Sequence, residues 1–358
     1  MDPLGQGVCR EGKTVTFIAG TLPGETGTAV VYKKSKGVQF ARLASLGTPS
    51  ANRCEPACPH FEGCPGCHYL HTDYASELRY KKATLLRHLA KLKISEQCIE
   101  LVQAPQRLAY RNRVQLHYRH KYIGMLDPIN NKVFEVPHCQ IIHEALQPAF
   151  SKLYEDRSWA DEHAGHGHCE LYVREGDVSV QWNGAYSHGG FSQVNDEMNR
   201  ELQTRVHQQL QDCAATHVLD LFSGEGNLSN KFSASGGQRT LVDSYWNAEA
   251  SPMPDNFSKL DLYGEDALKL FSRRQGKKSF DTMLLDPPRR GFPALDRWLK
   301  KIKPRYLLYV SCNPASLARD LATVSSKYKV VTVQLLDLFP GTYHFETLVV
   351  LRFAGKAA

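Results

Sequence analysis

The stretch from Tyr309 to Leu321, YVSCNPASLARDL, places a cysteine where an apolar segment meets a helix start. Residues 306–310 are typical of a buried strand, and the proline at position 314 suits the first turn of a helix. Cys312 is therefore expected at the end of a strand and near a helix N-terminus, where the macrodipole favours the nucleophilic thiolate. A small buried thiol fits this stretch equally well, because free cysteine packs readily in cores.

Two carboxylates are expected close to this cysteine. Asp286 follows the apolar run FDTMLL, and Glu346 begins the last apolar run of the chain. Ligands bind at the carboxyl edge of open α/β sheets, so Cys312, Asp286 and Glu346 are expected to face one crevice, although Asp286 could also be a simple turn former. A thiolate can add to C6 of a uracil ring and make C5 nucleophilic enough to accept a methyl group. A base then removes the C5 proton, and the thiol leaves.

A second motif, HVLDLFSGEGNLS, reads as a strand followed by Gly224-x-Gly226 and a helix. Glycines in such a turn let a ligand approach the backbone closely, but the third glycine of the dinucleotide fingerprint is missing. Asp243 ends the next strand, RTLVD, where its carboxylate could accept hydrogen bonds from both hydroxyls of a ribose. These features indicate a nucleoside-bearing cofactor, and the alternative for Asp243 is a helix cap.

The elements that position these residues belong to an α/β fold. From residue 191 to residue 358, apolar strands alternate with helical stretches, which predicts a parallel sheet wrapped by helices. The runs VVTVQLLDLF and FETLVVLRF are expected to form an antiparallel pair at its end.

Two further parts precede this domain. Residues 1–48 alternate short β-type runs with Gly-rich turns, which predicts a small antiparallel barrel or sheet. Residues 49–190 read as a mostly β central domain that also contains a helix from Asp73 to about Leu92. The basic residues of this helix are expected on a solvated face: they are Arg79, Lys81, Lys82, Arg87 and Lys91.

Composition narrows the function classes. The chain has 358 residues and a formal charge of +7, which permits a nucleic-acid partner without requiring one. It has neither an apolar run of membrane-spanning length nor a secretory signal pattern, so a cytoplasmic protein without a membrane partner is expected. Four of the ten cysteines fall between Cys54 and Cys67, and such a cluster in a cytosolic chain indicates metal before disulfides. Thiolate ligands suit both structural zinc and iron–sulphur clusters.

Three long motifs carry a family resemblance. LDPPRRG, VSCNPASLARDL and HFETLVVL resemble the signature motifs of the RNA (uracil-C5)-methyltransferases, and the whole chain is similar to their iron–sulphur-containing 23S rRNA branch. The resemblance implies a Rossmann-like class I S-adenosylmethionine methyltransferase domain, with Cys312 as nucleophile and Glu346 as general base. The cofactor contacts that it implies are Gln193, Phe222, Asn227, Asp243, Asp266 and Asp286. From spacing alone, Gln193 would be a surface polar residue, and family members often have Glu in place of Asp243.

The same resemblance implies a [4Fe–4S] cluster. Cys58, Cys64 and Cys67, with the distant Cys139, match the four ligands of the family, and Cys54 is then a spare thiol. Nothing in methylation at C5 requires a redox step, so a structural role for the cluster is favoured. A radical enzyme is a weaker alternative, because its C-x3-C-x2-C spacing is not met: five residues follow Cys58 before the next cysteine.

The expected function is S-adenosylmethionine-dependent methylation of a uridine in 23S rRNA at C5, through a covalent Cys–C6 intermediate, to give 5-methyluridine. The alternatives are the same reaction on tRNA and a non-catalytic iron–sulphur RNA-binding protein. The N-terminal segment resembles a TRAM domain, a small RNA-binding barrel, and the protein is expected to be a monomer. The basic residues expected to contact phosphates are Arg111, Arg113, Arg119, Lys121, Arg289 and Arg290.

Overall fold

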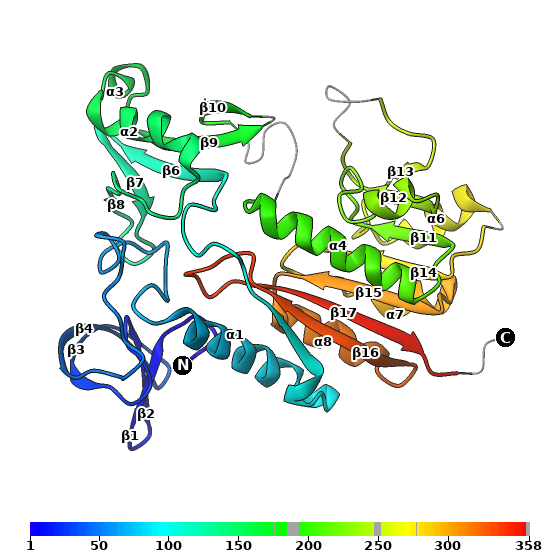
Figure 1. The fold of residues 1–358 in the computed structure, drawn as a ribbon, viewed down its shortest axis with the longest axis horizontal. Coiled ribbons are helices and arrows are strands. Elements are labelled where there is room, and N and C mark those ends of the chain that lie inside the picture. The colour runs from blue at the N-terminus through cyan, green and yellow to red at the C-terminus, as the bar shows by residue number, and fades with distance from the viewer. Residues whose placement is uncertain (175, 185–192, 247–251, 277, 356–358) are drawn as a thin grey trace.

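Three sheets organise the part of the chain that the computed structural model describes, which excludes residues 175, 185–192, 247–251, 277 and 356–358 (Figure 1). Within these described residues, no helix is long and apolar enough to cross a membrane.

The N-terminal sheet has four strands in the order β1-β2-β4-β3. Their bounds are β1 (Gly7–Glu11), β2 (Thr14–Ala19), β3 (Thr26–Ser35) and β4 (Val38–Thr48). The expected antiparallel arrangement is wrong at one place, because β2 and β4 pair in parallel. The chain makes this possible by crossing from β2 to the outer strand β3 before it returns as β4.

The central sheet has five strands in the order β10-β9-β6-β7-β8. The strands are β6 (Arg113–Arg119), β7 (Tyr122–Leu126), β8 (Val133–Phe134), β9 (His166–Arg174) and β10 (Asp177–Trp182). The helices α2 (Gln147–Glu155) and α3 (Trp159–Glu162) bring Phe150 and Trp159 into a core with Leu116 and Leu171 of the sheet. This mostly β region agrees with the predicted pattern.

The large sheet has eight strands in the order β13-β12-β11-β14-β15-β17-β16-β5. The bounds are β5 (Ile99–Val102), β11 (His217–Leu221), β12 (Gln238–Asp243), β13 (Phe257–Lys259), β14 (Thr282–Leu285), β15 (Tyr306–Ser311), β16 (Tyr328–Leu336) and β17 (Glu346–Phe353). The strands from β13 to β15 run parallel, and β17 runs antiparallel to both of its neighbours, as predicted for the last pair. The order reverses between β11 and β14, and a ligand crevice forms at such a switch point.

Helices cover both faces of this sheet, so its central strands are buried and mostly apolar. The covering helices are α1 (Tyr74–Leu89), α4 (Asp196–Asp212), α5 (Asn230–Ala234), α6 (Ala267–Gln275), α7 (Leu295–Ile302) and α8 (Pro314–Val324). Short 3₁₀ turns at Ala90–Leu92, Glu96–Cys98 and Glu144–Leu146 join other elements.

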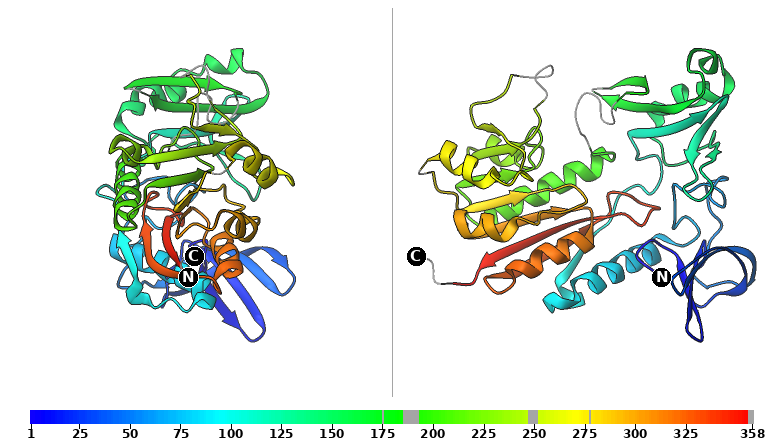
Figure 2. Two further views of the ribbon diagram at one scale, coloured as in Figure 1. Left: turned by 90° about the vertical axis from the view of Figure 1, so that its right-hand side faces the viewer. Right: turned by 180° about the vertical axis from the view of Figure 1, so that it is seen from behind.

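The large sheet also recruits residues that precede the central sheet in sequence. Strand β5 pairs in parallel with β16, and α1 lies beside α8 (Figure 2). Leu85 and Leu89 of α1 enter the same apolar core as Leu317 and Leu321 of α8. Part of the segment expected in the central domain therefore packs on the large sheet.

The helix predicted from Asp73 is present as α1, and the Asp73 carboxylate caps it by accepting a hydrogen bond from the Ser76 amide at 2.7 Å. One expectation about its surface is wrong, because Lys81 is fully buried. Its ammonium group pairs with Glu77 on the same helix and with Asp337 after β16, so a charge expected in solvent joins two distant segments.

Candidate active site

Cys312 lies where the sequence predicts, immediately after β15 and before α8. The buried strand β15 ends at the carboxyl edge of the sheet, so Cys312 lies at that edge. The Asn313 side chain then caps α8 by accepting a hydrogen bond from the Ala315 amide at 3.1 Å, and Pro314 opens the helix. The thiol is half-buried.

The electrostatic surroundings of Cys312 differ from those expected. Burial, followed by the charges of Glu346 and Asp286, raises the pKa of the thiol to about 12, and the charge of Arg289 and a backbone hydrogen bond oppose this rise. The start of α8, which is expected to favour the thiolate, therefore does not decide the protonation of Cys312. Desolvation and two carboxylates outweigh a helix terminus, because each disfavours a second negative charge.

Glu346 faces Cys312 because β17 pairs antiparallel with β15, with Ser311 opposite Thr347. Its side chain is almost completely buried, and its Oε2 atom has no hydrogen-bond partner among the described residues. Burial and the charge of Asp286 raise the pKa of this carboxyl well above its usual value. A buried carboxyl oxygen without a partner is costly, which is typical of a group that acts on a ligand.

Asp286 lies at the end of β14, where its backbone N–H donates to the Leu221 carbonyl at 3.3 Å. Burial and the charge of Asp220 raise the pKa of Asp286 to about 7. Asp220, within β11, accepts a hydrogen bond from the Ser229 hydroxyl at 2.6 Å. The thiol of Cys312 and the carboxyls of Glu346 and Asp286 thus lie at one edge of the sheet, as expected. Asp220 adds a third carboxyl further inside the sheet.

The loop after Asp286 is held by residues of α8 that the sequence reading did not single out. Asn313 Nδ2 donates to the Arg289 carbonyl at 2.8 Å, and Arg319 donates to the Arg290 carbonyl at 2.6 Å. Buried Asp320 accepts from the Phe292 amide at 2.5 Å. The signal was present, since Asn313, Arg319 and Asp320 lie in the same SCNPASLARD stretch as Cys312 and Pro314.

The turn after β11 has the backbone of a close-approach site. Phe222 adopts φ = 58°, which is strained for a bulky residue, and Gly224 and Gly226 have φ of 51° and 83°. A Cβ on Gly224 would meet nothing within 4 Å, so space above this turn is open. The Asp243 carboxylate accepts a hydrogen bond from the Gly224 amide at 2.9 Å. This combination fits a nucleoside cofactor, with Asp243 at the ribose.

Two of the other expected cofactor contacts, Gln193 and Asn227, are hydrogen-bonded to segments that are distant in sequence. Gln193 is buried, so the surface position expected from spacing is wrong, and its carbonyl accepts from the Asn112 side chain. The Asn227 amide group is held by Asn199 and Gln203 of α4.

The position of Asp266 does not favour the cofactor contact that is expected for it. It is exposed at the start of α6, 4.0 Å from the Lys269 ammonium. Asp261 instead follows the end of β13 by two residues, next to the strand that carries Asp243. Its neighbour Leu260 donates its N–H to the Asp243 carbonyl at 2.7 Å. Asp261 is not among the cofactor contacts predicted from sequence, because β13 is short and its end is hard to locate.

The four expected cluster cysteines line one cavity of about 290 Å³ beside the central sheet. They are Cys58, Cys64, Cys67 and Cys139. Cys54 lies outside this lining, exposed, with its thiol 3.7 Å from the Leu70 carbonyl. Within the described residues, no group of three or more His, Cys, Asp or Glu side chains is set to hold a metal ion. The thiols surround a space and do not meet at a point.

The cavity thiols interact with one another. Burial raises the pKa of Cys64 to about 11 and that of Cys67 further, and the neighbouring cysteines add to both effects. Arg111 lines the same cavity and opposes the rise for Cys67 and Cys139.

The basic residues proposed for phosphates are not equivalent. Arg113 is buried and pairs with Glu170 at 3.2 Å, so the expectation that it contacts a phosphate is wrong. Arg119 and Lys121 are exposed at the β6–β7 turn. Arg289 and Arg290 are exposed beside the active site, and the Arg290 guanidinium stacks on the Tyr263 ring.

Comparison with known proteins agrees with this site. A family model described as "tRNA (Uracil-5-)-methyltransferase" matches residues 268–353, which include Asp286, Cys312 and Glu346. The chain is 28% identical to a 23S rRNA (uracil(1939)-C(5))-methyltransferase, RlmD, of Shewanella baltica strain OS195, over 98% of this chain and 94% of the relative. The RlmD protein of Shewanella sp. strain W3-18-1 matches to the same extent.

A solved structure shares the fold. The tRNA (uracil-54, C5)-methyltransferase of Pyrococcus abyssi, in complex with S-adenosyl-L-homocysteine, superimposes with a TM-score of 0.69, 20% identity and 97% coverage of both chains. The comparisons, the strand order and the three motifs agree. The chain is thus similar over nearly its whole length to RNA (uracil-C5)-methyltransferases, and the matched family model covers the candidate active site.

Proposed function

We propose that this protein methylates C5 of a uridine in 23S rRNA, using S-adenosylmethionine, to give 5-methyluridine. The observation that carries the proposal is the meeting of the Cys312 thiol with the Glu346 and Asp286 carboxyls at the carboxyl edge of the sheet. A thiol and a base on the same ring are what substitution at an unreactive pyrimidine carbon requires.

The chain's own residues account for the bond changes at the uracil. Cys312 loses its proton, and its sulphur bonds to C6, which leaves C5 electron-rich. When S-adenosylmethionine is bound, it supplies an electrophilic methyl group and a positive charge. Glu346 then takes the proton from C5, the Cys312–C6 bond breaks, and the aromatic ring is restored with its new methyl group.

The raised pKa values indicate which of these side chains can give up or accept a proton. With a pKa of about 12, Cys312 holds its proton at neutral pH, and burial with the charge of Asp286 shifts the pKa of Glu346 upward, which makes that carboxyl a stronger proton acceptor once it is ionised. Asp286, with a pKa of about 7, is the nearby group that is partly ionised there and can receive the thiol proton. A positive charge bound at this edge opposes the causes that raised all three pKa values.

For the cofactor, the positions that fit best are Asp243, the Gly224–Gly226 turn and Phe222, whose ring packs against Tyr263 and Phe292. Asp243 would accept the ribose hydroxyls in place of the Gly224 amide. We place Asp261 at the adenine end of the site, since the carboxyl ends of β12 and β13 are adjacent.

Ribosomal RNA is favoured over tRNA because the full-length relatives at 28% identity are named as 23S rRNA enzymes, whereas the tRNA enzyme shares only the fold. The test is transfer of labelled methyl from S-adenosylmethionine to 23S rRNA fragments and to tRNA, followed by nucleoside chromatography. Label in 5-methyluridine from rRNA supports the proposal, and label only in tRNA favours the alternative substrate. Binding without transfer to either RNA would indicate the non-catalytic protein.

We also infer that the cavity thiols hold a [4Fe–4S] cluster. The supporting observations are the all-sulphur lining, which suits iron–sulphur ligation, and a cavity larger than one ion needs. Cys139, just after β8, would then tie the segment of residues 58–67 to the central sheet, so the role would be structural.

The N-terminal sheet is proposed as an RNA contact. Strand β3 is exposed along its whole length, and its Lys33 lies over the Phe40 ring while Arg42 of β4 lies over the Tyr32 ring. Basic and aromatic side chains on an open sheet suit phosphates and unpaired bases.

A further inference from the structure

The loop between β16 and β17, residues 337–345, leads directly into Glu346 and is held by segments that are distant in sequence. Four successive backbone carbonyls, those of residues 338–341, accept hydrogen bonds from outside the loop. Leu338 accepts from Asn195 (3.2 Å), Phe339 from Lys81 (3.2 Å), Pro340 from Tyr110 (3.0 Å), and Gly341 from the amides of His68 (2.7 Å) and Tyr69 (2.9 Å).

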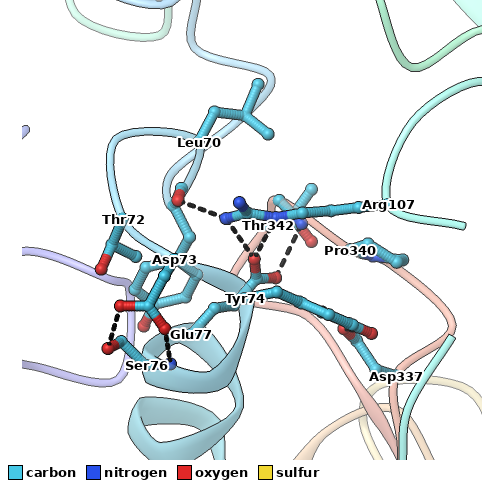
Figure 3. A network of polar contacts seen from close by, with 12 residues as sticks. Leu70, Thr72, Asp73, Tyr74, Ser76, Glu77, Arg107, Asp337, Pro340 and Thr342 are labelled. Carbon is cyan, nitrogen blue, oxygen red and sulfur yellow. Dashed lines mark hydrogen bonds and ion pairs between the residues drawn. The ribbon is translucent and has the colours of Figure 1, made fainter. Parts of the chain in front are cut away.

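The centre of this arrangement is a buried charge network, and Figure 3 shows three of its members, Glu77, Arg107 and Asp337, beside the loop. Glu77, Lys81 and Asp337 have side chains with no exposed surface. The Lys81 ammonium donates to Glu77 at 2.8 Å and to Asp337 at 2.6 Å. Glu77 also accepts a hydrogen bond from the Gly341 amide at 2.7 Å, so the network binds the loop directly.

Two further side chains complete the network. Arg107 donates to Glu77 Oε2 at 2.8 Å and to the Tyr69 carbonyl at 2.6 Å. The Tyr74 hydroxyl donates to Asp337 at 2.8 Å and accepts from the Ala104 amide at the same distance. Two carboxylates therefore meet two cations, and each carboxylate oxygen has a donor.

Hydrogen bonds and packing connect the held loop to Glu346, the proposed base. The Thr342 hydroxyl donates to the Phe339 carbonyl at 2.9 Å and accepts from the His344 amide at 3.2 Å. Phe345 is buried in the core, and Glu346 follows it as the first residue of β17. A shift of the loop would therefore move the Glu346 carboxyl.

Stability is a poor explanation for such a network. Burying charges costs desolvation energy that their attraction often only balances, and apolar residues of similar volume can serve as well. Reaction geometry is a better explanation, because displacing a catalytic group by about 1 Å can cost on the order of 100-fold in rate.

We propose that Glu77, Lys81 and Asp337 are positioning residues that fix Glu346 for removal of the C5 proton. The proposal rests on the function proposed above. It assigns the network to one step: Cys312 addition and methyl acceptance precede proton removal, so loosening the loop should stop the reaction after the covalent bond has formed.

The test compares Glu77→Gln with Glu346→Gln and the unaltered protein, using S-adenosylmethionine and the methyl-accepting RNA. Denaturing gels measure the RNA–protein adduct, and steady-state rates give kcat and KM. We expect Glu77→Gln to accumulate adduct, with kcat reduced about 10–100-fold and KM little changed. A purely structural role would lower adduct and turnover together.

Tyr110→Phe is the milder variant, because it removes only the hydroxyl that donates to the Pro340 carbonyl. It keeps the test decisive if Glu77→Gln does not fold, and it should also raise the adduct above the level of the unaltered protein. The matched control is Glu25→Gln, which breaks a buried ion pair with Arg53 in the N-terminal region. This control should leave the adduct level unchanged.

The outcomes separate the two proposals. If Glu346→Gln itself forms no adduct, the covalent function fails. If Glu346→Gln forms adduct but Glu77→Gln and Tyr110→Phe stay at the level of Glu25→Gln, the positioning role is wrong. Loss of both adduct and turnover in the network variants would also overturn it.

Discussion

The cysteines to which chemistry is assigned lie in two regions of this molecule, and their neighbours differ. At the edge of the large sheet, a single thiol, Cys312, faces the carboxyls of Glu346 and Asp286. In the cavity beside the central sheet, four thiols face one another and Arg111. Burial is the first cause of the raised thiol pKa in both places.

The comparison teaches that burial alone does not activate a thiol. Arg289 at the edge and Arg111 in the cavity only partly offset the raised thiol pKa values, so further positive charge would favour a thiolate in either region. In the cavity, iron shared by four sulphurs would supply that charge permanently. At the sheet edge, a cationic cofactor would supply it only during turnover, and the carboxyls there can receive protons. One region is thus suited to a lasting site and the other to a transient bond.

The largest effect is expected from removing the edge thiol. Cys312→Ala should reduce methyl transfer by about 1,000-fold or more, because no other group can bond to C6. Binding of S-adenosyl-L-homocysteine, measured by calorimetry, should be unchanged. The matched control is Cys54→Ala, an exposed cysteine outside the cavity lining. Normal turnover by Cys312→Ala would break the distinction between the two regions.

Removing a cavity thiol should act on metal content. Cys64→Ala is expected to lose iron, sulphide and visible absorbance in anaerobically purified protein, and to melt at a lower temperature, because metal binding contributes to folding. Cys54→Ala should retain all three. Zinc without sulphide in the unaltered protein would contradict the cluster.

Within the edge, two acids test where the cofactor lies. Asp261→Asn should weaken binding of S-adenosyl-L-homocysteine about tenfold, the effect of losing one good hydrogen bond to a ligand. Asp266→Asn is the control, since Asp266 is exposed beside Lys269. Equal affinities for the two variants would remove Asp261 from the site, and a loss confined to Asp266→Asn would restore the prediction from the motif.

The smallest effect concerns thiol reactivity and pH. Below its pKa of about 12, the Cys312 thiolate fraction should rise tenfold per pH unit, and alkylation followed by mass spectrometry should show that slope. Asp286→Asn removes a negative neighbour, so the pKa of Cys312 should fall and alkylation at pH 8 should quicken severalfold. Alkylation of Cys64, in metal-free protein, should not change. A fall in Cys312 reactivity would show that Asp286 does not oppose the thiolate.

Local patterns predicted the sheet edge well. Apolar runs ending in Asp243, Asp286 and Cys312 located three strand ends, and parallel pairing brought those ends together. The α1 helix and its Asp73 cap were likewise readable, because capping depends on neighbours in sequence.

Long-range pairing was not predictable in the same way. The burial of Lys81 depends on Asp337, which lies 256 residues away, and the place of β5 depends on β16. The raised pKa of Cys312 also escaped the sequence reading, since a helix start is visible in sequence but the distance to two carboxyls is not.

The most direct test of the account is the site of the covalent bond. Glu346→Gln protein, incubated with S-adenosylmethionine and 23S rRNA fragments, should give an adduct that survives denaturation. After nuclease and protease digestion, mass spectrometry should place a methylated uridine on the peptide that contains Cys312. A stable adduct on any other residue, or full turnover without an adduct, would contradict the account.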